Sequence, residues 1–176
     1  AYPINGCPEV QYTKTQNGRL RLQAGSGYYH NGNHAATLDC DAYNSSAPSN
    51  SLIITLNLEY YRYAEDITLT FYYMHHGEES HMNDIVMIRG YSGASWINVY
   101  DLYANRAASG TWKEVTIDID EELANAGQYP KSTFQIYIGQ EDDYPATSLT
   151  GTDGITIDDI SVESNTICWT GAVDND

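Results

Sequence analysis

Positive charge is scarce in this chain of 176 residues: 8 Lys and Arg residues stand against 24 Asp and Glu, for a formal net charge of -16. Nucleic acids and anionic membranes attract proteins through clustered Lys and Arg, so the sequence argues against both as partners. So many carboxylates also repel one another, and a bound cation would relieve that repulsion. The charge alone leaves two interpretations open: a surface that serves solubility, or one that binds calcium.

Long hydrophobic runs are lacking too. The longest, such as residues 52–58, fall far short of the roughly 20 apolar residues that cross a bilayer, so no membrane insertion is expected. Hydrophobic residues nevertheless make up 41% of the chain, which argues against disorder. The length suits one domain, and no repeat, linker or change of composition divides it. The sequence therefore predicts a single domain over residues 1–176.

Cysteine is scarce, with only Cys7, Cys40 and Cys168, and the close Cys pairs typical of a metal site do not occur. An odd number leaves at least one thiol unpaired within the chain. Cys7 and Cys168 lie near opposite termini, which often meet in a jelly roll, so they either form a disulfide or stay free. Cys40 is expected to be a small buried residue.

Alternation of apolar and polar residues is abundant, as in residues 67–74, where the odd-numbered side chains are apolar or aromatic and belong inside. Only residues 120–127 look helical, because Asp120 can cap the first turn and Gly127 suits the end. We therefore predict an all-β fold, an antiparallel β-sandwich of jelly-roll type with one short helix. Eight segments at least are strand candidates: residues 19–24, 52–58, 67–76, 84–91, 96–103, 113–120, 133–140 and 154–162. Asn17-Gly18 predicts a hairpin between residues 13–15 and 20–22.

The densest polar cluster lies in residues 75–84 (HHGEESHMND). Glu79 and Asp84 are candidate calcium ligands, because carboxylates on a loop fit the flexible oxygen coordination of calcium. An ordinary polar hairpin loop and a transition-metal site are the alternatives. A zinc hydrolase would need two or three His with a carboxylate base, and His76, Glu79 and His81 are the residues that could form one.

Asp158 and Asp159 interrupt the apolar segment 154–162. Neighbouring side chains in a strand point to opposite faces, so one of these carboxylates is expected to face the core. Burying an unpaired charge costs several kcal/mol, of the order of 3 to 5. Two arrangements would remove that cost, a calcium ion or hydrogen bonds from the backbone. Asp39, in residues 36–40 (ATLDC), is a further candidate calcium ligand.

Residues 153–162 (DGITIDDISV) resemble the final strand of MAM-like jelly rolls and of the cleaved-adhesin domains of bacterial haemagglutinin-proteases. The resemblance covers about residues 18–162, and its other segments follow in a similar order: residues 36–40 (ATLDC), 57–73 (NLEYYRYAEDITLTFYY), 76–81 (HGEESH), 110–127 (GTWKEVTIDIDEELANAG) and 132–145 (STFQIYIGQEDDYP). Cys40 and the short N-terminal region depart from the family pattern.

The resemblance implies a β-sandwich that is usually non-catalytic and that belongs to large secreted or cell-surface bacterial proteins. Related carbohydrate-binding jelly rolls use an Asp of the last strand for structural calcium, a role that falls here on Asp159, with Asp158 as the alternative. The partners it implies are a glycan or another extracellular ligand, and other domains of the same polypeptide.

Tyrosine is unusually common, with 16 Tyr against 2 Phe. A Tyr ring with its polar hydroxyl suits an exposed sheet face that binds polar ligands, although aromatic residues also favour strands in general. If the predicted strands are neighbours, their outward positions form one aromatic and amide patch that could bind sugars. The candidate ligand-binding residues are Tyr72, His76, Arg89, Tyr100, Gln135 and Tyr137, extended from a Gly-rich loop by Tyr28 and Tyr29.

Taken together, these observations predict a non-catalytic carbohydrate-binding or adhesin-like module, stabilised by calcium. A structural or protein–protein module beside a catalytic domain is the first alternative. A metal-dependent glycan-active or hydrolytic enzyme centred on His76, Glu79 and His81 is the second. Against an enzyme, the chain has no Gly-x-Ser-x-Gly elbow, phosphate loop or dinucleotide fingerprint.

Overall fold

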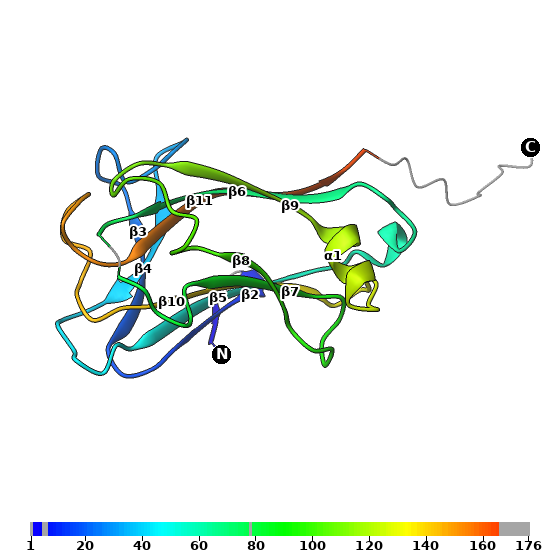
Figure 1. Ribbon diagram of the computed structural model, residues 1–176, viewed down its shortest axis with the longest axis horizontal. Coiled ribbons are helices and arrows are strands. Elements are labelled where there is room, and N and C mark those ends of the chain that lie inside the picture. Colours follow the sequence, from blue (N-terminus) through cyan, green and yellow to red (C-terminus); the bar gives the residue numbers. More distant parts are fainter. Residues whose placement is uncertain (1, 5–6, 78, 166–176) are drawn as a thin grey trace, which may run out of the picture.

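The computed structural model describes residues 2–4, 7–77 and 79–165, which form two antiparallel sheets packed face to face (Figure 1). The first sheet has the order β1-β2-β5-β10-β7-β8, and the second β3-β4-β11-β6-β9. Strands of the first sheet are β1 (Tyr2–Ile4), β2 (Cys7–Lys14), β5 (Ser49–Leu56), β10 (Phe134–Glu141), β7 (Ile85–Arg89) and β8 (Ile97–Asp101). Strands of the second are β3 (Gly18–Gln23), β4 (Ala35–Cys40), β11 (Ile155–Ser164), β6 (Ile67–His75) and β9 (Lys113–Asp118).

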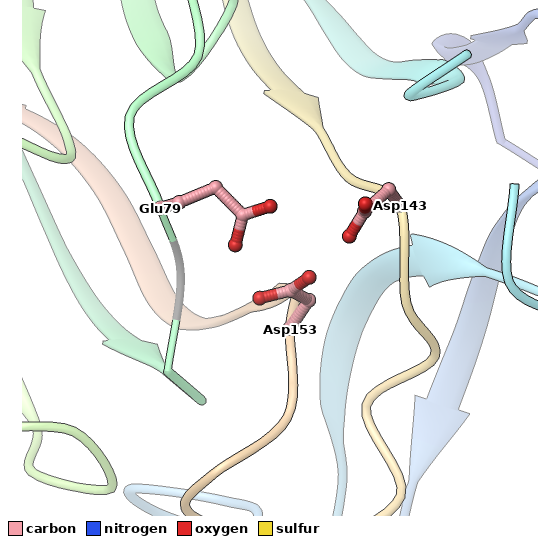
Figure 2. A group of neighbouring side chains, drawn as sticks. All are labelled: Glu79, Asp143 and Asp153. Carbon is pink, nitrogen blue, oxygen red and sulfur yellow. The ribbon is translucent and has the colours of Figure 1, made fainter. Parts of the chain in front are cut away.

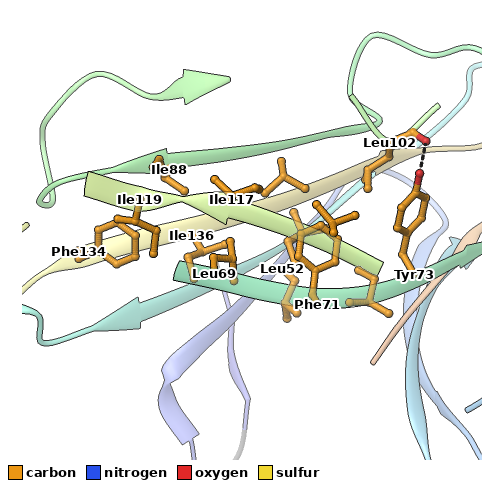
Figure 3. Close-up of a cluster of buried hydrophobic side chains, with 14 of the residues drawn as sticks. Leu52, Leu69, Phe71, Tyr73, Ile88, Leu102, Ile117, Ile119, Phe134 and Ile136 are labelled. Carbon is orange, nitrogen blue, oxygen red and sulfur yellow. Dashed lines mark hydrogen bonds between the residues drawn. The ribbon is translucent and has the colours of Figure 1, made fainter. Parts of the chain in front are cut away.

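The core fills the space between the two sheets (Figure 3). Leu69, Phe71 and Tyr73 of β6 point inward as the alternation predicts, and Phe134 and Ile136 of β10 meet them from the first sheet. Each is buried almost completely, and burial of one such side chain contributes about 1.5–3 kcal/mol. The predicted all-β sandwich is therefore confirmed.

The helix α1 (Ile119–Asn125) begins and ends slightly earlier than predicted. Asp118, and not Asp120, caps it, because the Asp118 carboxylate accepts a hydrogen bond of 2.9 Å from Glu121 N. Ile119 and Leu123 lie one turn apart and are both buried, which fixes the helix on the core. The 3-10 turn η1 (Glu59–Tyr61) was not predicted.

The predicted hairpin at Asn17-Gly18 is only half right. A turn does form, since Gly18 N donates to Thr15 O at 3.0 Å. However, β2 pairs with β5 and β3 pairs with β4, so this turn connects the two sheets. The local sequence specifies a chain reversal but not the sheet that the next strand joins.

Cys40 is buried and free, as expected, and burial raises the pKa of its thiol to about 12. The predicted choice between a Cys7–Cys168 disulfide and two free thiols lies outside the described residues. Within the described part of the chain, none of the helices has the length and apolar character needed to cross a membrane.

Candidate functional site

Three of the predicted ligand-binding residues meet on the outer side of the first sheet. Arg89 of β7 and Gln135 of β10 lie opposite each other, and Arg89 Nε donates to Gln135 Oε1 at 2.7 Å. Gln135 Nε2 in turn donates to Thr55 Oγ1 of β5 at 3.0 Å. Tyr137 follows two residues along β10 and so lies on the same side. Hydrogen bonds therefore hold planar polar groups in place across three neighbouring strands.

Trp96 completes this surface and was not among the predicted site residues. Its ring centroid lies 5.6 Å from that of Tyr137 at an interplanar angle of 59°, and the Arg89 guanidinium lies 4.3 Å from the Trp96 centroid. The sequence gives little signal for it, because Trp96 lies just before β8 and side-chain alternation there does not define a face. We call Arg89, Trp96, Gln135 and Tyr137 the aromatic face.

Gly139 shows how the Tyr137 ring lies. A Cβ atom at Gly139 would come within 2.6 Å of Cε1 of Tyr137 and within 2.6 Å of the Asn83 carbonyl oxygen. The ring therefore extends along β10 over Gly139 and lies along the sheet surface. Burial raises the pKa of Tyr137, which keeps its hydroxyl protonated as a hydrogen-bonding group. Such a half-buried ring has an apolar surface for stacking and a fixed position.

Tyr100 is not part of the aromatic face, contrary to prediction. Its ring points into the sandwich, edge-on to Phe71 at 6.4 Å and to Tyr73 at 6.1 Å. The cause is a β-bulge in the β7–β8 pairing, where the register shifts between Val86 and Met87. A bulge adds one residue to a strand and reverses which side chains face the core, so simple alternation along residues 96–103 gives the wrong side for Tyr100.

Tyr72 and His76 lie on β6 or just after it and face the outer side of the second sheet, so the prediction of one shared face is wrong for them as well. The His30 ring stacks on Tyr72 at 3.7 Å. His76 is fully buried, with Nε2 2.7 Å from Thr156 Oγ1 and Nδ1 3.3 Å from Leu149 O. Burial lowers the pKa of His76 to about 4. With both ring nitrogens engaged, His76 does not join Glu79 and His81 in a metal or catalytic site.

The loop that carries Tyr28 and Tyr29 covers this outer side of the second sheet; we call residues 24–34 the covering loop. The Tyr28 ring packs on His76 with centroids 5.5 Å apart, and Tyr29 is half-buried beside it in the chain. Neither residue lies on the aromatic face of the first sheet. Their predicted role at the rim of that face is therefore not supported by their position.

Asp158 and Asp159 anchor the covering loop. Asp158 Oδ2 accepts hydrogen bonds from His30 N at 2.8 Å and Asn31 N at 3.2 Å, and Asp159 Oδ2 lies 2.7 Å from His30 Nδ1. The prediction that one of the pair faces the core is wrong. A bulge follows Asp158, and Asp159 has a positive φ of 50° and is exposed. Backbone hydrogen bonds, the second of the two predicted arrangements, satisfy Asp158.

Two other predicted metal ligands also serve as internal acceptors. Asp39 is fully buried and lies between two guanidinium groups, with Arg19 Nη2 at 2.7 Å and Arg21 Nη2 at 2.8 Å, and it accepts from Ala146 N. Positive charge so close disfavours a cation at Asp39. Asp84 is buried and accepts from His81 N at 3.0 Å and Glu141 N at 2.9 Å.

A different set of carboxylates converges at one end of the sandwich (Figure 2). Glu79, Asp143 and Asp153 each offer an oxygen, and these oxygens all lie within 4.8 Å of one another. We call these three residues the acidic cluster. Among the predicted metal ligands only Glu79 belongs to it. Asp143 and Asp153 were missed, although the acidic run 141–143 at the end of β10 and the Asp153-Gly154 turn before β11 gave a signal.

The acidic cluster is electrostatically strained. Burial, the charge of Asp142 and the contacts with Asp143 and Glu79 raise the pKa of Asp153 to about 9. Burial and the charge of Asp39 raise the pKa of Asp142 to about 7. Glu79 and Asp153 also line a pocket of about 390 Å³, which other residues of the two loops complete: Gly77, Tyr144, Pro145, Thr147, Gly151 and Thr152.

No protein-family model matches this sequence, and a search of curated proteins gives no match. Solved structures do match in fold. A family 30 carbohydrate-binding module is 17% identical, with a TM-score of 0.55 over 94% of this chain and 83% of that one. A β-1,2-glucanase from Parabacteroides distasonis is 12% identical, with a TM-score of 0.52 over 90% of this chain and 23% of the enzyme. The K2 cleaved adhesin domain of Lys-gingipain is 15% identical, with a TM-score of 0.48 over 88% and 90%.

At these identities the likeness concerns the fold. The predicted jelly roll is confirmed, and it is a fold that carbohydrate-binding modules use. Fold alone does not assign a function, so the function must be argued from the aromatic face and the acidic cluster.

Proposed function

We propose that this chain is a non-catalytic carbohydrate-binding module that binds a glycan on the aromatic face of the first sheet. The observation that carries this proposal is the joint placement of Trp96 and Tyr137 beside Arg89 and Gln135 on one sheet surface. Sugars have apolar ring faces that stack on aromatic side chains, and equatorial hydroxyls that bond to planar donors and acceptors. The aromatic face supplies both kinds of group on rigid strands.

The expected affinity is modest. Stacking on one aromatic ring supplies roughly 1 kcal/mol, and a net hydrogen bond about the same. Two rings with a few hydrogen bonds then give a free energy near -4 to -6 kcal/mol, which corresponds to a dissociation constant of about 1 mM to tens of micromolar. Because the Trp96 and Tyr137 rings are tilted by 59°, one flat sugar chain cannot stack on both, so a twisted or branched glycan fits better.

The charge of the chain narrows the ligand class. A net charge of -16 repels uronic acids and sulfated sugars at long range. Arg89 is the cation of the aromatic face, and its guanidinium is already engaged by Gln135, Trp96 and, at 3.4 Å, Ala94 O. Neutral glycans are therefore the expected ligands. The proposal extends to a secreted or cell-surface protein in which this module tethers other domains of the same polypeptide to the glycan, as the sequence resemblance implies.

The test is a panel of neutral and acidic polysaccharides, screened for binding and followed by isothermal titration with the best ligand. Trp96→Ala should weaken binding about fivefold, since a stacking contact worth roughly 1 kcal/mol is lost with little change in the core. Tyr63→Ala is the matched control, because Tyr63 is 85% exposed and lies outside the aromatic face. Failure of every glycan to bind, or unchanged binding by Trp96→Ala, would contradict the proposal. Binding of a peptide in place of a glycan would favour a protein–protein module.

A further inference from the structure

We propose that the acidic cluster is a divalent-cation site, most suited to Ca²⁺, that ties together two loops at one end of the sandwich. Glu79 comes from the β6–β7 loop, and Asp143 and Asp153 come from the two ends of the β10–β11 loop. In Figure 2 the three carboxylates point toward one common space. Glu79 thus meets two carboxylates that lie more than 60 positions further along the chain. Repulsion opposes this arrangement unless a proton or a cation neutralises part of the charge.

A second observation is independent of the clustering. Asp153 is only 4% exposed, and its Oδ2 atom is buried without a hydrogen-bond partner among the described residues. The same holds for Oδ2 of Asp142, which is fully buried next to it in the loop. A buried polar oxygen without a partner costs about 1–3 kcal/mol, and more when it is charged. A cation in the acidic cluster would give Asp153 the partner that it lacks.

Two other buried carboxylates do have hydrogen-bond donors, so the lack of donors is confined to this end of the sandwich. Asp39 has two arginines and a backbone N–H as partners, and Asp84 has two backbone N–H groups. The fold therefore satisfies its internal carboxylates with protein donors where it can. Among the residues that the structure describes, only at the acidic cluster do several carboxylates converge with buried oxygens that have no donor, which is the arrangement that a metal ion completes.

The geometry favours calcium. Ca²⁺ takes six to eight oxygen ligands at about 2.3–2.6 Å, so two oxygens on one ion lie at most about 5 Å apart, and the oxygens of the acidic cluster meet that limit. The donors are all carboxylates, which suits a hard cation better than Zn²⁺. Three carboxylates supply three to six ligands, and the 390 Å³ pocket lined by Glu79 and Asp153 leaves room for water in the remaining positions. The ion would thus be reachable from solvent and exchangeable.

The first experiment titrates Ca²⁺ into the chelator-stripped protein by calorimetry. We expect one saturable site in the wild type, and Asp143→Asn and Glu79→Gln should each weaken it about tenfold or more, because each removes one ligand charge. Asp159→Asn is the matched control: it removes an exposed carboxylate of β11 that binds His30, and it should leave the calcium affinity unchanged. Loss of binding in Asp159→Asn, or wild-type affinity in both Asp143→Asn and Glu79→Gln, would overturn the proposal.

Thermal melting supplies a readout that a purely structural role would not give. In saturating Ca²⁺ the wild type should melt at a higher temperature than in EDTA, by mass action on the native state. Asp153→Asn and Asp143→Asn should show a much smaller calcium shift than the wild type, because their affinity for the ion is lower. In EDTA they should melt at or above the wild type, because each removes a carboxylate from the crowded acidic cluster. If Asp153→Asn fails to fold, the more exposed Asp143 and Glu79 variants decide the question. A wild type that melts identically in EDTA and in calcium would contradict the site.

Discussion

The two outer sides of the sandwich differ in what covers them. The outer side of the second sheet is covered by the loop 24–34, fixed by Asp158 and Asp159, and by the β10–β11 loop, fixed through Asp39 and Ala146. The outer side of the first sheet carries the aromatic face. The strands of both sheets alternate in the same way, so alternation alone does not say which side is available to a ligand. That depends on the loops, and on where their polar backbone groups find partners.

The two groups of acidic residues show the same contrast. Asp158 and Asp159 attract attention in the sequence, yet they accept hydrogen bonds from the covering loop. Asp143 and Asp153 are less conspicuous, yet they converge with Glu79 and keep buried oxygens without protein donors. A pair of carboxylates therefore indicates a metal site only when the surrounding backbone leaves its oxygens unsatisfied.

The largest expected effect of a single substitution is on the covered side. Asp39→Asn removes the charge that lies between Arg19 and Arg21, and replaces an oxygen that accepts from Ala146 N with a donor. Breaking a buried ion pair on one side costs about 3–5 kcal/mol. We expect the free energy of unfolding to fall by about 3 kcal/mol, the lower end of that range, because both arginines are partly exposed. Urea denaturation measures it.

Asp41→Asn is the control for that substitution. Asp41 also pairs with Arg19, at 2.8 Å, but its side chain is 72% exposed. Exposed ion pairs contribute little to stability, so the free energy of unfolding should hardly change. Equal losses in the two variants would mean that the Asp39 network does not hold the β10–β11 loop on the second sheet.

One buried titratable group beside each sheet makes stability depend on pH, and the two dependences have opposite signs. Burial raises the pKa of Asp84, next to the first sheet, from 3.8 to about 6. Between these values the unfolded chain binds fewer protons than the folded one, so the free energy of unfolding falls as pH rises, by about 3 kcal/mol in all. Burial lowers the pKa of His76, on the second sheet, from 6.5 to about 4. Between pH 4 and pH 6.5 the unfolded chain binds more protons at His76 than the folded one, so the free energy of unfolding rises with pH by a similar amount.

The measurement compares each variant with the wild type at about pH 4 and about pH 7. As pH rises, the free energy of unfolding of Asp84→Asn should increase relative to that of the wild type. The free energy of unfolding of His76→Gln should decrease relative to that of the wild type over the same pH range. If both differences change with the same sign, one of the two groups is not buried as the structure describes.

A smaller effect is expected from releasing the covering loop. Asp158→Ala removes the acceptor for His30 N and Asn31 N, which should cost about 1–2 kcal/mol, like the loss of a helix N-cap. Hydrogen exchange at these two amides should become faster while the amides of β10 keep their protection. Uniformly faster exchange would show that the loop is part of the global folding unit, and that the covered side is not a separate layer.

Much of the fold could be predicted from the sequence, because the burial of Leu69, Phe71 and Tyr73 follows directly from alternation along one long strand. The site could be predicted only in part. Arg89, Gln135 and Tyr137 come together as expected, since their strands are neighbours. Tyr100 was misplaced because a bulge leaves no simple mark in the sequence.

The remaining errors have one cause, the order of strands and loops in space. Tyr72 has the right orientation relative to its own strand, but that strand belongs to the other sheet. Trp96 and Asp143 lie just outside regular strands, where alternation predicts nothing. Their roles depend on which loops meet at the ends of the sandwich, and a single sequence does not encode that in any local pattern.

The most direct test of the account follows the indole N–H resonances of Trp96 and Trp112 by NMR while the best neutral glycan is titrated. Trp96 lies on the aromatic face, and Trp112 lies on the covered side, edge-on to His30 at 5.7 Å. Each tryptophan therefore reports on one side of the same molecule, without any substitution. The Trp96 resonance should shift to saturation, and the Trp112 resonance should stay in place. A saturating shift of Trp112 with no change at Trp96 would contradict binding at the aromatic face.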